Sequence, residues 1–224
     1  MLSAQWRLFV PDMPGLGESP PPPKPYDAYI IARPLAEGLE RILPSAARYD
    51  IAGFSFGGLI GGHVAELHGG RVKRYIAVAP GGLGIERTTE RPPLAKLRPH
   101  MSKAEFDAAH RHNLSVIMFA DPGKFDALAV YLQIQSVRRG RTKSVPIART
   151  DTLALALPKI DAEIKAIYST QDDATGTGLA QRRALFEKFQ PDMDFRVIGG
   201  AGHWVMYETP DQFNAMLIDM LAEK

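Results

Sequence analysis

Apolar and polar residues follow two alternating periodicities along most of the chain. Five short apolar runs that end at turn residues predict β-strands, at residues 6–10, 49–54, 72–79, 164–169 and 195–198. Apolar residues at helical spacing predict helices, over residues 27–43, 57–67, 178–189 and from 210 to near the C-terminus. Strands that alternate with helices are typical of a parallel sheet. The pattern therefore predicts an α/β fold, with a mostly parallel sheet and helices on both faces.

The last predicted helix has a distinct start. Thr209 is predicted as its N-cap, Pro210 occupies the first helical position, and Gln212 completes a predicted capping box. Its apolar face consists of Phe213, Met216, Leu217, Met220 and Leu221.

The middle of the chain interrupts this alternation. It contains no clear strand, and helical patterns cover residues 102–120 and 123–138. Residues 87–149 carry 12 Lys or Arg against 5 Asp or Glu, although the net charge of the whole chain is only +2. We therefore predict a basic helical insertion. The predicted parts are a first core part at 1–86, the insertion at 87–156 and a second core part at 157–224.

The composition narrows the classes of function. The chain has no cysteine, which excludes disulfides, thiolate metal sites and a cysteine nucleophile. No run reaches the roughly 18 apolar residues of a membrane span. The N-terminus lacks the charged start and apolar stretch of a signal peptide. These features predict a soluble, cytoplasmic protein with no membrane partner, and the low net charge argues against a nucleic-acid partner.

The stretch Gly53-Phe54-Ser55-Phe56-Gly57 has the pattern G-x-S-x-G, with a predicted strand before it and a predicted helix after it. This is the context of a nucleophile elbow, a tight and strained turn that exposes the serine oxygen. The N–H of Phe56, at the start of the helix, would point to where an oxyanion forms. A nucleotide-binding loop does not fit, because Ser55 stands in place of the middle glycine and no Gly-Lys-Ser/Thr follows.

A serine nucleophile needs a base and an acid that orients the base. His203 lies in a glycine-rich loop, 199–204, directly after a predicted strand, and Asp172 and Asp173 follow another strand. The carboxyl ends of parallel strands meet at one edge of the sheet, so we expect Ser55, His203 and one aspartate to meet there. The spacing leaves open which aspartate it is.

The other histidines do not predict a metal site. His63 and His68 fall on the helix after the elbow, and His110 and His112 are two residues apart, which places them on different faces of a helix. His100 is uninformative. We predict no metal and no organic cofactor.

Three stretches make the chain resemble the α/β-hydrolase superfamily. VPDMPGLGES at 10–19 looks like the loop after the family's fourth strand, and GFSFG at 53–57 matches the elbow. GHWVMYETP at 202–210 looks like the histidine loop and last helix of C–C bond hydrolases of aromatic degradation and related esterases. The resemblance implies that the insertion is a cap. It also implies a G-x-x-D frame for the acid; Ser169 stands in the glycine's place, and this frame selects Asp172.

The resemblance further implies a departure at the N-terminus. In the family, three strands precede the one expected at 6–10, and the third ends in a loop whose N–H completes the oxyanion hole. The chain begins after them, so we expect a slot between 6–10 and 49–54, lined by backbone groups without partners. We hypothesise that Met1 is internal to a longer protein, or that the chain is a truncated and impaired form.

The sequence therefore predicts a serine hydrolase in which Ser55 attacks a carbonyl, His203 transfers the proton and Asp172 holds the imidazolium. The predicted substrate is a small organic molecule, cleaved at an ester or at a C–C bond next to a carbonyl; the basic cap suggests an anionic one. A peroxidase-like activity and a non-catalytic binding protein are the alternatives. A homodimer is compatible with the sequence. The candidate substrate contacts are Asn113, Met118, Phe119, Tyr131, Leu132, Arg138, Arg139, Arg141 and Trp204.

Overall fold

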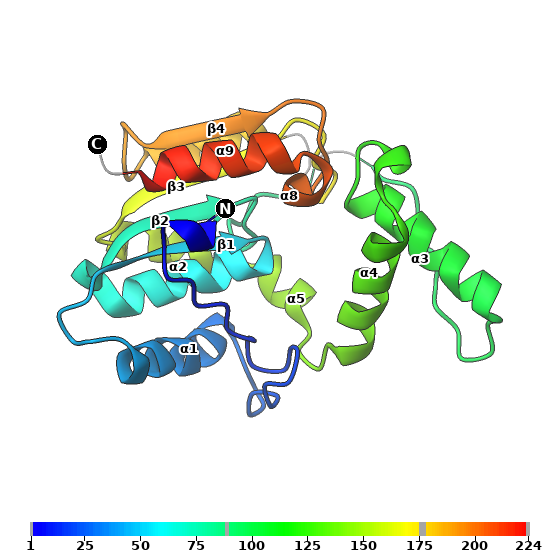
Figure 1. The fold of residues 1–224 in the computed structure, drawn as a ribbon, viewed down its shortest axis with the longest axis horizontal. Helices are drawn as coiled ribbons and strands as arrows, with labels where there is room; N and C mark the ends of the chain where they lie inside the picture. Colours follow the sequence, from blue (N-terminus) through cyan, green and yellow to red (C-terminus); the bar gives the residue numbers. More distant parts are fainter. Residues whose placement is uncertain (1, 88–89, 175–177, 223–224) are drawn as a thin grey trace.

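The computed structural model describes residues 2–87, 90–174 and 178–222. Its centre is a parallel sheet with the strand order β1-β2-β3-β4, which is also the order of the strands in the chain (Figure 1). The strands are β1 (Tyr49–Phe54), β2 (Val72–Val78), β3 (Glu163–Ser169) and β4 (Asp194–Ile198). All four agree with strands predicted from the sequence. Phe54 pairs with Val78, and Val78 pairs with Ile167, so the carboxyl ends of the strands lie at one edge of the sheet.

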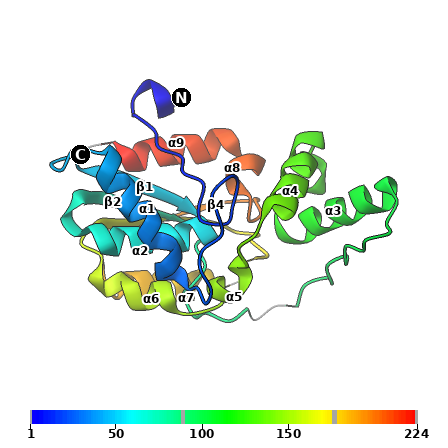
Figure 2. The same ribbon diagram turned by 90° about the horizontal axis from the view of Figure 1, so that it is seen from below.

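Helices cover both faces of the sheet (Figure 2). Because crossovers between parallel strands are right-handed and the strand order never reverses, the helices that connect the strands lie on the same face. That face carries α1 (Ala28–Ile42), α2 (Phe56–His68), α6 (Thr152–Ala156) and α7 (Leu179–Glu187). The opposite face carries α9 (Pro210–Leu221). Short 3-10 turns are η1 (Leu2–Ala4), η2 (Gly69–Arg71), η3 (Pro122–Lys124) and η4 (Leu157–Lys159). Within the described ranges, no helix has the length and apolar character for crossing a membrane.

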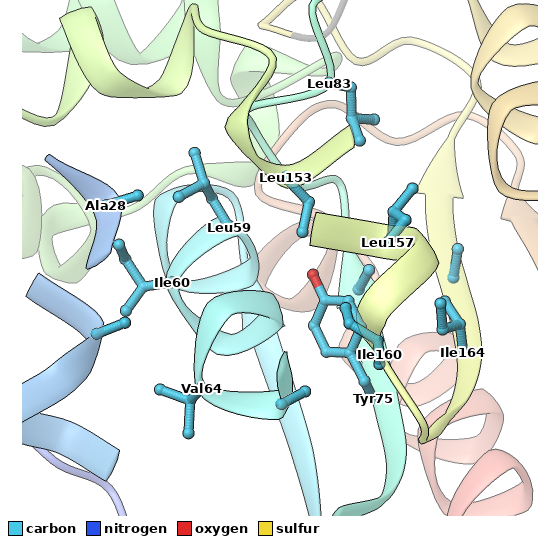
Figure 3. Close-up of a cluster of buried hydrophobic side chains, with 14 of the residues drawn as sticks. Ala28, Leu59, Ile60, Val64, Tyr75, Leu83, Leu153, Leu157, Ile160 and Ile164 are labelled. Carbon is cyan, nitrogen blue, oxygen red and sulfur yellow. The ribbon is translucent and has the colours of Figure 1, made fainter. Parts of the chain in front are cut away.

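The larger hydrophobic core lies between the sheet and α2. Leu59 and Ile60 of α2 pack in one cluster with Tyr75 of β2 and Leu153 of α6, all of them almost inaccessible to solvent (Figure 3). Alternate residues of a strand face opposite sides of the sheet, so Ile76 of β2 belongs to the second core, beneath α9. The predicted α/β fold is confirmed.

The predicted strand at residues 6–10 is wrong. These residues form no strand, and the side chain of Val10 is 91% exposed. A strand needs the backbone groups of a neighbour, but β1 pairs with β2 alone among the described residues and is an edge of the sheet. The free edge of β1 lines a cavity of about 940 Å³, whose other walls include residues 6–11, α1, α2 and the end of α9.

The middle of the chain is helical, as predicted, but it divides in two. The helices α3 (Lys103–Ile117) and α4 (Ala127–Arg139) pack on each other beside the carboxyl end of the sheet (Figure 1). The sequence analysis missed α5 (Ser144–Ala148) and α6. Ile147 and Leu153 of these two helices join the core under the sheet. The last part of the predicted insertion therefore packs with the core, and α3 and α4 are called the cap helices below.

The capping box predicted at Thr209 is wrong. The Thr209 hydroxyl donates to the carbonyl of Val205, at 2.9 Å, in the short helix α8 (Val205–Glu208), and makes no cap hydrogen bond to α9. The first cap helix has a complete capping box instead, between Ser102 and Glu105.

Candidate active site

Ser55 sits in the turn between β1 and α2. Its backbone has φ 51° and ψ −114°, a left-handed conformation that is costly for a residue with a Cβ. Two hydrogen bonds hold the turn: the Ser55 N–H donates to Val78 at 2.8 Å, and the Ser55 carbonyl accepts from Gly81 at 3.2 Å. The strained turn is thus fixed by the end of β2 and by the loop that follows it.

The glycines around Ser55 allow the backbone to pack tightly. A Cβ on Gly53 would lie 2.4 Å from the carbonyl oxygen of Gly57, and one on Gly58 would lie 2.8 Å from the carbonyl oxygen of Gly53. No side chain fits at those distances. The steric need for glycine therefore falls on Gly53 and Gly58, where the end of β1 meets the start of α2, whereas a Cβ on Gly57 would have only Met13 Cε nearby, at 4.0 Å.

His203 and Asp172 complete a chain of hydrogen bonds that starts at Ser55. The distance between Ser55 Oγ and His203 Nε2 is 2.9 Å, and that between His203 Nδ1 and Asp172 Oδ2 is 2.8 Å. His203 and Asp172 are almost fully buried. The other oxygen of Asp172 accepts the N–H of Ala174, at 2.9 Å, which fixes the orientation of the carboxylate.

Asp173, the alternative acid, points to a different partner. Its carboxylate forms an ion pair with Arg87, at 2.9 Å, and its side chain is 42% exposed. The structure therefore places Asp172 next to the imidazole and Asp173 at the surface.

Tyr168 precedes this loop in β3 and is completely buried. Burial raises the pKa of its phenol well above 10; Arg182 lowers that pKa, and the nearby Asp172 carboxylate raises it further. The phenol of Tyr168 thus stays neutral and adds no second negative charge near the Asp172 carboxylate.

The predicted oxyanion donor, Phe56, is the first residue of α2. The first N–H groups of a helix have no acceptor within the helix, and the helix dipole adds partial positive charge there. The Phe56 N–H is therefore in a position to donate to an anion beside Ser55.

Three of the predicted substrate contacts lie beside the histidine loop. The Trp204 N–H donates to the carbonyl of Met118 at 2.8 Å, and the ring of Phe119 packs edge-on against Trp204 and Tyr207. Burial, together with a hydrogen bond to Asp126, raises the pKa of Tyr207 to about 12. This aromatic group joins the base of the cap to the site.

The other predicted substrate contacts are engaged elsewhere or exposed. The side-chain amide of Asn113 accepts a hydrogen bond from the N–H of Ala95 and donates one to its carbonyl. The guanidinium of Arg138 lies over the ring of Phe106, 5.3 Å from its centroid. Arg141 donates to the carbonyls of Gly17 and Ser19. On the second cap helix, Tyr131, Leu132 and Arg139 are exposed. No contact of these side chains brings them to Ser55 within the described part of the chain.

Sequence reasoning missed two polar residues that shape the site. The Ser169 hydroxyl donates to the carbonyl of Gly202 at 2.7 Å, and the buried carboxylate of Glu208 accepts the N–H of Gly202 at 2.7 Å. From the sequence, Ser169 was noted only as the residue in the glycine's place of the G-x-x-D frame, and Glu208 only as part of the stretch 202–210. No local signal marks them, because their partners lie far away in the sequence or come together only on folding.

Histidine and acidic side chains do not form a metal site: in residues 2–87, 90–174 and 178–222, no three of them gather so that they could hold an ion.

The comparisons with known proteins give a family and a fold. The profile of the alpha/beta hydrolase family matches residues 2–216. The chain matches no curated protein sequence.

Three similar solved structures cover almost all of the chain. A meta-cleavage product hydrolase from Pseudomonas fluorescens IP01, crystallised as a mutant with acetates, has a TM-score of 0.73 at 21% identity, over 97% of this chain and 80% of its own. A putative aryl esterase from Burkholderia cenocepacia has a TM-score of 0.72 at 19% identity, over 94% and 77%. A thermophilic esterase from Thermogutta terrifontis has a TM-score of 0.66 at 17% identity, over 98% and 81%. The fold and the match over residues 2–216 together show that this chain belongs to the α/β-hydrolase family.

Proposed function

We propose that the chain is a serine hydrolase that cleaves an ester, or a C–C bond next to a carbonyl, in a small organic substrate. One observation carries the proposal: Ser55 Oγ, His203 and Asp172 form an unbroken chain of hydrogen bonds that begins at a strained turn. The solved structures that resemble the chain include a C–C bond hydrolase and esterases, which supports this range of reactions.

The residues would divide the chemistry as follows. Ser55 Oγ attacks the carbonyl carbon while His203 Nε2 takes its proton, and Asp172 stabilises the imidazolium through Nδ1. The Phe56 N–H donates to the oxyanion. His203 then gives the proton to the leaving group, and water, activated by His203, releases the acyl group from Ser55.

The substrate would lie between the elbow and the base of the cap, where Met118, Phe119 and Trp204 gather. The excess of basic residues in the middle of the chain supports an anionic substrate. Two of the candidate partners for its charge are engaged elsewhere: Arg138 lies over Phe106, and Arg141 donates to the 17–19 loop. Rates on matched neutral and carboxylate-bearing esters, each measured against salt concentration, decide this part. Equal salt dependence contradicts it.

Intact mass after incubation with a fluorophosphonate tests the reaction class. We expect one adduct per chain on the unmodified protein and none on Ser55→Ala. A folded protein that takes up no adduct contradicts the proposal and favours a non-catalytic binding protein of the same fold. If the adduct forms, turnover of aryl esters and of vinylogous diketone acids distinguishes the esterase from the C–C bond hydrolase.

A further inference from the structure

The carboxylate of Glu208 is buried among backbone N–H groups of two segments, the nearby loop at Gly202 and the distant residues 120–121. Glu208 ends α8 and is 5% exposed. Its Oε2 accepts the N–H of Gly202 at 2.7 Å and the N–H of Ala120 at 3.1 Å, and its Oε1 accepts the N–H of Asp121 at 2.8 Å. A carboxylate that accepts several backbone N–H groups is a strong and directional anchor.

The two segments are the loop of the proposed base and the base of the cap. Gly202 directly precedes His203, and residues 120–121 lie between the end of α3 and the turn η3. A single side chain therefore links the backbone beside the imidazole to the segment that connects the cap helices.

A second set of contacts ties the same two segments together. The Trp204 N–H, on the other side of His203, donates to the carbonyl of Met118 at 2.8 Å. Gly202 packs so closely on this segment that a Cβ there would lie 2.6 Å from the Ala120 nitrogen. His203 is thus held from both flanks by residues 118–121, directly at Trp204 and through Glu208 at Gly202.

We infer that Glu208 is a positioning residue that fixes His203 against Ser55 and ties the geometry of the triad to the base of the cap. The inference rests on the proposed serine hydrolase function. Glu208 touches no reacting atom; it acts through the Gly202 backbone. Losing it breaks the link between Gly202 and residues 120–121, while the Ser169 hydroxyl still holds the Gly202 carbonyl. The loop is then less constrained on this flank, and a displacement of about 1 Å at a reacting group can reduce the rate about 10²-fold.

The kinetics of fluorophosphonate labelling at Ser55 provide the test. For Glu208→Ala we expect the maximal labelling rate to fall about 10²-fold, with little change in the concentration that gives half of that rate. For Glu208→Gln we expect a smaller loss, because the amide oxygen can still accept two N–H groups while its NH₂ faces the third. The control is Thr209→Val, which removes the side-chain hydrogen bond to the carbonyl of Val205 in the same turn and none of the three hydrogen bonds of Glu208. It should label like the unmodified protein.

Amide hydrogen exchange measures the anchor itself. Gly202, Ala120 and Asp121 should exchange faster in Glu208→Gln than in the unmodified protein, whereas amides in the core of β2 should not change. If Glu208→Ala does not fold, labelling and amide exchange of Glu208→Gln test the inference. Unchanged labelling and exchange in folded Glu208→Gln overturn the inference. Failure of the unmodified protein to label at all is a different result, which counts against the proposed function.

Discussion

The nucleophile elbow and the cap helices differ in how firmly their residues are held. At the elbow, the distances around Gly53 and Gly58 leave no room for another atom. In α2, which follows the elbow, ten of the 13 residues are buried. On the second cap helix, Leu128, Tyr131 and Val137 are each about half exposed. The proposed catalytic geometry depends on fixed distances, and its residues lie on the packed core. The outer face of the cap helices has fewer such packing constraints.

The largest expected effect lies within the acid loop. Asp172→Asn should reduce kcat about 10⁴-fold on an ester substrate, because an amide at this position favours the wrong tautomer of the imidazole. Asp173→Asn should keep its activity and lose at most about 1 kcal/mol of stability, because its ion pair with Arg87 is partly exposed. Steady-state kinetics and urea unfolding measure both variants. Equal losses of kcat in the two variants would contradict the assignment.

Substitutions in the core should cost more stability than substitutions on the exposed face of the cap helices. Leu153→Ala should lower the free energy of unfolding by about 2–5 kcal/mol, because this buried side chain packs on Gly62 of α2. Leu128→Ala, on the exposed face of the second cap helix, should change it by no more than about 0.5 kcal/mol. Urea unfolding followed by circular dichroism gives both numbers. Similar losses would mean that the cap face is covered in solution.

Two glycine substitutions test the packing of the elbow. Gly53→Ala should destabilise the protein by about 1–3 kcal/mol and lower the labelling of Ser55, since its Cβ meets the backbone of Gly57. Gly38→Ala is the matched control. It lies in α1 with open space around its Cβ, so it should stabilise the protein by about 0.5–1 kcal/mol. Thermal unfolding measures whether each substitution raises or lowers the stability. A stabilising Gly53→Ala would contradict the steric account.

The smallest effect concerns pH. His63 is fully buried in α2, with Nε2 at 3.1 Å from the Thr152 hydroxyl, and burial lowers its pKa. His63 therefore binds a proton more readily in the unfolded chain than in the folded protein. Protonation of His63 thus lowers the free energy of unfolding as the pH falls through about 6.5. The loss of stability between pH 7.5 and 5.5 should be smaller in His63→Phe than in the unmodified protein. Equal acid sensitivity in the two proteins would rule out His63.

The sequence by itself determined the features that depend on neighbouring residues. The alternation of strands and helices predicted four strands of the sheet and the α/β fold, because periodicity records which side of an element is buried. The G-x-S-x-G stretch predicted Ser55 as the nucleophile, because the residues that form the turn are neighbours in the sequence. A glycine-rich loop after a strand predicted His203 as the base for a similar reason.

The tertiary structure decided what depends on distant partners. Residues 6–10 have the composition of a strand, but a strand forms only where backbone groups of a neighbour face it. The residue pattern left Asp172 and Asp173 open, and only the resemblance favoured Asp172; folding directs one to His203 and the other to Arg87. Glu208 gave no signal because two of its partners lie almost 90 residues away. Hydrogen bonds of that kind are specified by the whole packed fold, and no local pattern records them.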